Sequence, residues 1–177
     1  MGMYKFIAKC NPQKTTPENW DSVMSTDNIN GIWFFGLAGS GKSYASKLIM
    51  ECTENAFIVD GDNVRLKIST DLGYTVQDRL IQINRLLGIG ELVIENKYFP
   101  IISSVYMTED VRKRCEAAHI KVVKIIRETA QILEHRKIYE TEENVVGKDI
   151  KEHEIQCDNI FNRGDERFVK QVKKYVE

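Results

Sequence analysis

Two short segments carry the residue types that phosphate chemistry needs, and the first is Gly36–Ser43. It reads GLAGSGKS and fits the pattern GxxxxGK[ST]. An apolar run, Ile32 to Phe35, precedes it, and a helical pattern, Lys42 to Cys52, follows. Glycines let the backbone N–H groups of such a loop converge on phosphate oxygens at the positive end of a helix. The segment therefore predicts a nucleoside triphosphate site.

The residues of this loop are expected to have different roles in binding. Lys42 is expected to reach the β- and γ-phosphates and to act in catalysis, while Ser43 ligates Mg²⁺. ATP and Mg²⁺ are thus the predicted cofactors. The predicted ATP-binding residues of the loop are Gly36, Leu37, Ala38, Gly39, Ser40, Gly41, Lys42, Ser43 and Tyr44.

The second segment follows the apolar run Ala56 to Val59 and reads DGDNVR. Phosphoryl transfer to an alcohol needs a carboxylate that holds Mg²⁺ or takes the hydroxyl proton, and a cation that holds an anionic acceptor. Asp60, Asp62 and Arg65 supply these groups, which predicts a kinase. The alternative is a turn that caps the next helix through Asp62 or Asn63, and capping is compatible with catalysis.

Other classes of triphosphate-binding protein fit less well. A GTPase needs an NKxD-like guanine-reading segment after a strand, which the sequence lacks, and a motor ATPase normally needs a longer chain. A regulatory module that binds ATP without catalysis remains an alternative. Such a module has no need of a second carboxylate beside Asp60, so the sequence favours an enzyme.

The pattern of apolar residues predicts the elements that position both segments. Runs of strand length lack hydrophobic alternation, which indicates a parallel sheet covered by helices on both faces, a three-layer α/β fold. Ligands bind at the carboxyl ends of such strands. The five expected strands are Ile32–Phe35, Ala56–Val59, Phe99–Ser104, Ile120–Ile126 and Asn159–Phe161. The expected helices are Lys42–Cys52, Val76–Asn96, Thr108–Ala118, Thr129–Tyr139 and Glu166–Val176.

Residues 1–30 are polar and interrupted by Pro12 and Pro17, which predicts an N-terminal extension with a short helix near Trp20 to Met24. Residues 31–177 are expected to form one domain. After the last predicted strand, Asn162 and Arg163 stand in a turn that lines the adenine of ATP in many P-loop kinases. An ordinary strand-to-helix turn is the alternative.

Composition narrows the possible partners. The 25 basic residues nearly balance the 26 acidic ones, for a net charge of −1, which argues against binding to nucleic acid. No apolar run is long enough for a membrane span. The four cysteines form no CxxC pair and fit a reducing compartment, so a cytoplasmic protein is expected.

In the order and spacing of three segments, the chain resembles the adenylylsulfate (APS) kinase family of P-loop kinases. The segments are GLAGSGKS, DGDNVR and DLGYTVQDR, the last covering Asp71 to Arg79. The resemblance runs from Gly31 to the C-terminus and is strongest through Arg85. It implies a P-loop NTPase fold, transfer of the γ-phosphoryl of ATP to the 3′-hydroxyl of a nucleotide ribose, and a homodimer.

The same resemblance suggests roles for single residues. Asp60 and Asp62 serve the metal and the attacking hydroxyl, with Asp62 as the base and Asp60 as the metal ligand. Arg136 resembles a lid arginine that closes over ATP, and Lys137 and Tyr139 resemble a shortened lid segment. The acceptor-binding residues implied are Asp62, Arg65, Tyr74, Arg79, Gln82, Ser104, Val105, Lys137 and Val145.

The chain departs from the family where the acceptor base is held. The family's KEN, ISPYR and FTGID segments appear as Leu80–Gln82, Tyr106–Asp110 and Val145–Asp149. Losing one aromatic wall of a base site removes stacking of about 1–3 kcal/mol. Because the anion-holding arginines are kept, these changes favour another base: cytidine diphosphoramidate, the acceptor of an APS-kinase-like enzyme of capsule phosphoramidate biosynthesis. Adenylylsulfate is the alternative acceptor.

Overall fold

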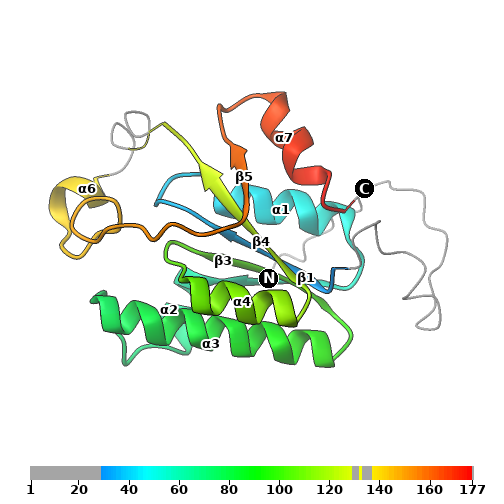
Figure 1. The fold of residues 1–177 in the computed structure, drawn as a ribbon, viewed down its shortest axis with the longest axis horizontal. Helices are drawn as coiled ribbons and strands as arrows, with labels where there is room; N and C mark the ends of the chain where they lie inside the picture. The colour runs from blue at the N-terminus through cyan, green and yellow to red at the C-terminus, as the bar shows by residue number, and fades with distance from the viewer. Residues whose placement is uncertain (1–28, 129–131, 133–136, 177) are drawn as a thin grey trace, which may run out of the picture.

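A computed structural model describes residues 29–128, 132 and 137–176 of the chain. Five strands form one sheet in the order β2-β3-β1-β4-β5, and every neighbouring pair is parallel (Figure 1). Their bounds are β1 Gly31–Phe35, β2 Ala56–Asp60, β3 Phe99–Ser104, β4 Ile120–Ile126 and β5 Asp158–Phe161. The predicted parallel five-stranded sheet is confirmed.

Helices cover both faces of this sheet, which confirms the three-layer arrangement. Figure 1 shows α3 and α4 below the sheet and α1 and α7 above it. The helix bounds are α1 Lys42–Cys52, α2 Gly61–Lys67, α3 Val76–Glu95, α4 Glu109–Ala117, α6 Ile138–Thr141 and α7 Glu166–Lys173. In the described part of the chain, none of these helices has the length and apolar character needed to cross a bilayer.

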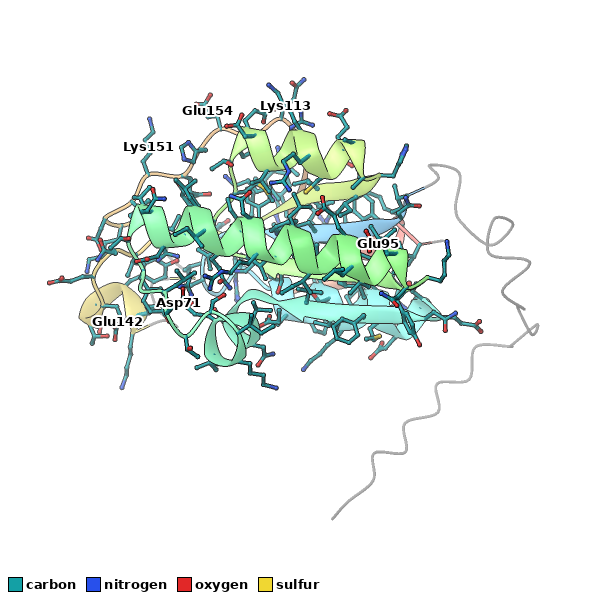
Figure 2. The ribbon with its side chains drawn as sticks, turned by 90° about the horizontal axis from the view of Figure 1, so that it is seen from below. Asp71, Glu95, Lys113, Glu142, Lys151 and Glu154 are labelled. Carbon is teal, nitrogen blue, oxygen red and sulfur yellow. The ribbon has the colours of Figure 1, made fainter. Side chains whose placement is uncertain are left out.

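The burial of the central strand β1 explains why apolar and polar residues do not alternate along it. Trp33 and Phe35 pack into a core with α3 and α4, whereas Ile32 and Phe34 pack into a second core with α1 and α7. Both faces of β1 are therefore buried, and each position needs an apolar side chain. Charged side chains such as Lys113 on α4 point away from the body of the protein (Figure 2).

The start of α3 is fixed by a reciprocal pair of side-chain hydrogen bonds. The Thr75 hydroxyl accepts from the backbone N–H of Asp78, and the Asp78 carboxylate accepts from the backbone N–H of Thr75. This capping box fixes the first turn of the helix. Arg79 follows on that turn and so emerges at a defined place beside the loop that ends at Thr75.

Two predicted elements fall mainly outside the described residues. The short helix near Trp20 to Met24 lies entirely there, as does Arg136. Of the helix expected over Thr129 to Tyr139, only Ile132 and residues 137–139 are described, and α6 begins at Ile138.

Candidate active site

A cleft of about 1100 Å³ opens at the carboxyl ends of β1, β2 and β3. It brings together most of the residues predicted for ATP, metal and acceptor. The predicted residues that line it are Ala38, Gly39, Gly41, Lys42, Ser43, Tyr44, Asp60, Asp62, Arg65, Tyr74, Arg79, Gln82, Ser104, Val105, Lys137 and Val145. Gly36, Leu37, Ser40, Asn162 and Arg163 do not line it.

Two glycines give the loop between β1 and α1 its shape. Gly36 has φ +148°, and a Cβ there would stand 2.3 Å from the carbonyl oxygen of Ile125. Gly41 has φ +108° and caps α1 at its N-terminus, where a Cβ would meet the Asn162 amide at 2.3 Å. Any larger residue at these positions forces the loop outward. The first residues of α1, Lys42 to Tyr44, line the cleft, and the free N–H groups of a helix N-terminus stabilise an anion.

Lys42 is held at the base of this loop. Its Nζ donates to the carbonyl oxygens of Gly36 at 2.8 Å and Leu37 at 2.9 Å. Both acceptors belong to the loop itself, so the ammonium already lies where phosphate oxygens would gather. Tyr139, predicted as part of the lid, donates from its hydroxyl to the carbonyl of Ala38 at 3.3 Å and is buried against the loop.

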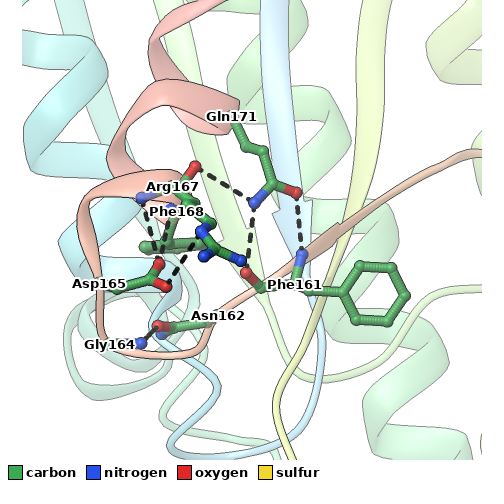
Figure 3. A network of polar contacts seen from close by, with 7 residues as sticks. All are labelled: Phe161, Asn162, Gly164, Asp165, Arg167, Phe168 and Gln171. Atoms are coloured by element: carbon green, nitrogen blue, oxygen red, sulfur yellow. Dashed lines mark hydrogen bonds and ion pairs between the residues drawn. The ribbon is translucent and has the colours of Figure 1, made fainter.

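Asn162 braces the loop from behind. Its Nδ2 donates to the Ser40 carbonyl at 2.7 Å, and its Oδ1 accepts from the backbone N–H of Gly164 at 2.9 Å (Figure 3). The side chain is only 8% exposed. Both ends of the amide are thus used within the protein, and Asn162 orients the loop. The predicted contacts of Asn162 and Arg163 with adenine stay predictions.

Removing this brace is expected to destabilise the protein. An Asn162→Ala variant leaves the buried Ser40 carbonyl and the Gly164 N–H without that amide, which lowers the free energy of unfolding by about 1–3 kcal/mol. Denaturant unfolding measures the loss. Asn159→Ala, at an exposed asparagine of β5, is the matched control and should stay within about 0.5 kcal/mol of wild type. Equal stability of both variants would contradict the brace.

Asp60 is fixed from three directions. Its Oδ1 accepts from the backbone N–H groups of Asp62 and Asn63, both at 3.1 Å, and its Oδ2 accepts from the Ser103 hydroxyl at 2.8 Å. Asp60 is therefore the N-cap of α2, and the alternative that placed the cap at Asp62 or Asn63 is wrong. The Asp62 side chain is exposed on the first turn of α2, within the cleft.

The donor set fits a magnesium ion. The Ser43 hydroxyl and the Asp60 carboxylate line the same cleft, and Mg²⁺ typically takes one or two carboxylates together with water and phosphate oxygens. Among the described residues, His, Cys, Asp and Glu form no group of three that could hold a metal by themselves. A metal here would need the phosphates of ATP to complete its shell.

Two arginines flank the ring of Tyr74. The guanidinium carbons of Arg65 and Arg79 lie 4.7 and 5.6 Å from the ring centroid. Arg65 donates to the carbonyl of Gly73, and Arg79 donates to the carbonyls of Tyr74 at 3.1 Å and Asn144 at 2.6 Å. The loop that carries Tyr74 is tied to α3 by Asp71 and Arg85, paired at 2.6 and 2.8 Å.

This arrangement, here called the arginine pair (Arg65 and Arg79), is suited to an anion. Burial lowers the pKa of Arg79, and the neighbouring charge of Arg65 lowers it further. Like charges at close range repel each other, and an anion between them would relieve that repulsion. Asp62 acts in the opposite direction on the pKa of Arg79, which places the predicted base near the arginine pair.

Two predicted acceptor residues are mostly covered. Val145 is 4% exposed and packs with Ile132, Tyr139 and Leu37. Gln82 is also 4% exposed, and its Nε2 donates to the carbonyl of Gly61 at 3.0 Å. Each lines the cleft with only this small exposed fraction, so neither presents a flat surface to a base.

Several residues of the cleft were missed in the sequence analysis. Ser103 stands opposite Asp60 in the register of β2 and β3, a proximity that only the strand order reveals. Arg127 follows β4 and donates to the carbonyl of Gly39 at 3.2 Å. The sequence could have indicated Arg127, because it directly follows the apolar run of a predicted strand. The other residues missed are Gly61, Ile83, Leu86, Tyr106, Ile138, Thr141, Glu142, Glu143 and Val146.

Comparisons with known proteins agree with this geometry. The family model described as adenylylsulphate kinase matches residues 29–144. The adenylyl-sulfate kinase of Buchnera aphidicola subsp. Schizaphis graminum is 31% identical over 87 residues, which are 47% of this chain and 41% of that protein. The bifunctional enzyme CysN/CysC of Xylella fastidiosa is 33% identical over 86 residues, 46% of this chain and 14% of that protein. The matches thus span less than half of these relatives.

A solved structure extends the likeness to the fold. The Mycobacterium tuberculosis APS kinase CysC, in complex with AMPPNP and APS, superposes with a TM-score of 0.73 at 19% identity, covering 84% of this chain and 95% of that one. The likeness confirms the predicted P-loop kinase fold. The family model covers more than half of the chain and includes both the phosphate loop and the arginine pair. The chain therefore belongs to the adenylylsulphate kinase family.

Proposed function

We propose that the protein transfers the γ-phosphoryl group of ATP to the 3′-hydroxyl of adenylylsulfate. The observation that carries the proposal is one cleft in which the phosphate loop, two carboxylates and the arginine pair face one another. The family match and the names of the relatives favour adenylylsulfate over the cytidine acceptor expected from the sequence.

In the proposed mechanism each residue of the cleft has one task. Mg²⁺, held by Ser43 and Asp60, would neutralise phosphate charge. Lys42 exchanges its loop carbonyls for the β- and γ-phosphate oxygens. Arg65 and Arg79 hold the sulfate end of the acceptor and keep its ribose in place. Asp62 takes the proton of the 3′-hydroxyl as its oxygen bonds to the γ-phosphorus, the bond from that phosphorus to the β–γ bridging oxygen breaks, and ADP leaves.

Cytidine diphosphoramidate is a second candidate acceptor because of the way the Val145 side chain is packed. Its side chain is aliphatic and packs against Tyr139 and Leu37, so this segment supplies no aromatic ring on which an acceptor base could stack. The stacking lost with such a ring, about 1–3 kcal/mol, supports an acceptor with a base other than adenine. The same cleft would then hold a phosphoramidate in place of a sulfate.

A panel of acceptors tests the proposal. The protein is incubated with MgATP and, separately, adenylylsulfate, cytidine diphosphoramidate, CDP and CMP, and ADP release and new 3′-phosphates are measured. Turnover of adenylylsulfate above the others is the expected result. Preferential turnover of cytidine diphosphoramidate would transfer the assignment to the second candidate. ATP binding without acceptor-dependent ADP release would indicate a non-catalytic module. Sedimentation velocity measures the mass of the protein in solution and tests the expected homodimer separately.

Replacing either arginine of the pair is expected to damage acceptor use selectively. Arg65→Ala and Arg79→Ala each remove a charge-assisted contact of about 1.5–3 kcal/mol, so the KM for the acceptor should rise about tenfold to a hundredfold. The KM for ATP should change less than about twofold, because the hydrogen bonds of the two arginines go to the carbonyls of Gly73, Tyr74 and Asn144, which are not part of the phosphate loop.

Steady-state kinetics with each substrate varied in turn measures both constants. Arg114→Ala on α4 is the control, because Arg114 is half exposed, pairs with Glu91 at 3.8 Å and lies outside the cleft. A larger change for ATP than for the acceptor would refute the assignment of the arginine pair.

A further inference from the structure

Tyr106 forms part of the cleft wall but is anchored outside the cleft. It follows β3, lines the cleft and is only 4% exposed. Its hydroxyl lies 2.7 Å from Nε2 of His153, in the segment between the Val146–Ile150 bridge and β5, and the two rings meet edge to face with centroids 5.3 Å apart. His153 itself is exposed to solvent. The exposed His153 thus contacts a residue of the cleft wall through one hydrogen bond.

The backbone of Tyr106 is fixed as firmly as its side chain. The Ser104 hydroxyl donates to the Tyr106 carbonyl at 2.8 Å, and the indole Nε1 of Trp33 donates to the same Ser104 oxygen at 2.9 Å. Trp33 is fully buried in the centre of the sheet. The ring of Tyr106 packs in the core that contains Trp33, and the contact with His153 fixes the polar end of the side chain, its hydroxyl.

Tyr106 lies on the acceptor side of the cleft. Burial raises the pKa of the Tyr106 hydroxyl, and the positive charge of Arg79 lowers it, which reflects the proximity of the tyrosine to the arginine pair. The neighbouring residues Ser104 and Val105 line the same wall. A change in the orientation of this ring would therefore alter the space beside Arg79.

We propose that His153 is a positioning residue for the acceptor pocket, holding the Tyr106 ring in the orientation that the acceptor requires. The proposal rests on the proposed function, because it assumes an acceptor beside Arg79. A tyrosine hydroxyl both donates and accepts, so it donates to an unprotonated Nε2 and accepts from a protonated one. The contact therefore forms with either tautomer of the imidazole and acts as a structural tether.

The test separates affinity for the acceptor from affinity for ATP. His153→Ala is expected to raise the KM for adenylylsulfate about fivefold, the effect of one hydrogen bond, with the KM for ATP unchanged and the melting temperature lowered by no more than about 2–4 °C. Tyr106→Phe keeps the ring, lacks the hydroxyl and should raise the same KM to the same extent. The combined variant should match either single one, because both remove the same bond.

A conservative replacement and a neighbouring control sharpen the result. His153→Gln supplies an amide that can donate or accept and should restore part of the acceptor affinity. Glu154→Ala alters the adjacent residue, whose side chain points away from the body of the protein (Figure 2), and should behave as wild type. Additive effects of His153→Ala and Tyr106→Phe, or wild-type acceptor kinetics in both, would overturn the positioning role.

These outcomes are distinct from failure of the proposed function. A wild-type protein that turns over none of the nucleotides in the acceptor panel would overturn the proposed function and this inference together. Normal turnover by wild type with unaltered acceptor KM in the variants would overturn the inference alone. The same kinetics with cytidine diphosphoramidate apply if that acceptor is preferred.

Discussion

Asp62→Asn is expected to lower kcat about 10²–10⁴-fold while the affinity for ATP stays within about twofold of wild type. Asparagine keeps the shape of aspartate but cannot take the proton of the acceptor hydroxyl. The backbone N–H of Asp62 still donates to Asp60, so the cap of α2 survives the change. Single-turnover kinetics measures the chemical step, and calorimetric titration with an ATP analogue measures affinity.

A matched variant on another helix controls for the loss of a surface charge. Asp110 is exposed in the first turn of α4, as Asp62 is in the first turn of α2, and lies outside the cleft. Asp110→Asn should therefore leave kcat unchanged. If Asp62→Asn kept the wild-type rate, Asp62 would not be the catalytic base, and Asp60 would be the next carboxylate to test in that role.

Lys42→Met is expected to cost about 10²–10³-fold in kcat, the usual loss when a preorganised donor to transition-state charge is removed. Methionine keeps most of the length of the side chain but has no cation for the β- and γ-phosphates. It also cannot donate to Gly36 and Leu37, so the empty loop loses two internal hydrogen bonds. Affinity for ATP should fall together with the rate.

Lys47 provides the comparison for this variant. It is exposed on the same helix, one turn further along, and does not line the cleft. Lys47→Met should retain the wild-type rate and ATP affinity. A normal rate in Lys42→Met, measured by ADP release with a saturating acceptor, would contradict the assigned role of the phosphate loop and with it the proposed mechanism.

The fold could be predicted from the sequence wherever burial on two faces forces a continuous apolar run. The bounds of β3 and β4 match the expectation, and those of β1, β2 and β5 differ by one residue. Helix α2 was not in the list of expected helices and entered only through the capping alternative, because its seven residues, GDNVRLK, are mostly polar, with Val64 as its one buried residue. Its start is set by the Asp60 cap, which the sequence presents only as one of two similar carboxylates.

The phosphate side of the site could be predicted because it is local in sequence, whereas the acceptor side is assembled from distant segments. Lys42 and its carbonyl partners lie within six residues of one another. Arg79, by contrast, meets Asn144 across 65 residues, and Gln82 turns its amide toward Gly61. Substitutions on that side are visible in the sequence, but the direction of each side chain depends on packing. Adenine and cytosine therefore could not be separated on residue types alone.

The bond between Asn162 and Ser40 has a consequence for the order in which the protein is made. The two residues are 122 positions apart, so the phosphate loop leaves the ribosome long before its brace exists. Contacts of such long range close late in folding, because the intervening chain must first be ordered. The nascent chain therefore gains a fully shaped ATP site only after β5 and its turn have joined the sheet. Nucleotide binding is in this sense a property of the completed domain, although the binding motif is among the first parts of the domain to be synthesised.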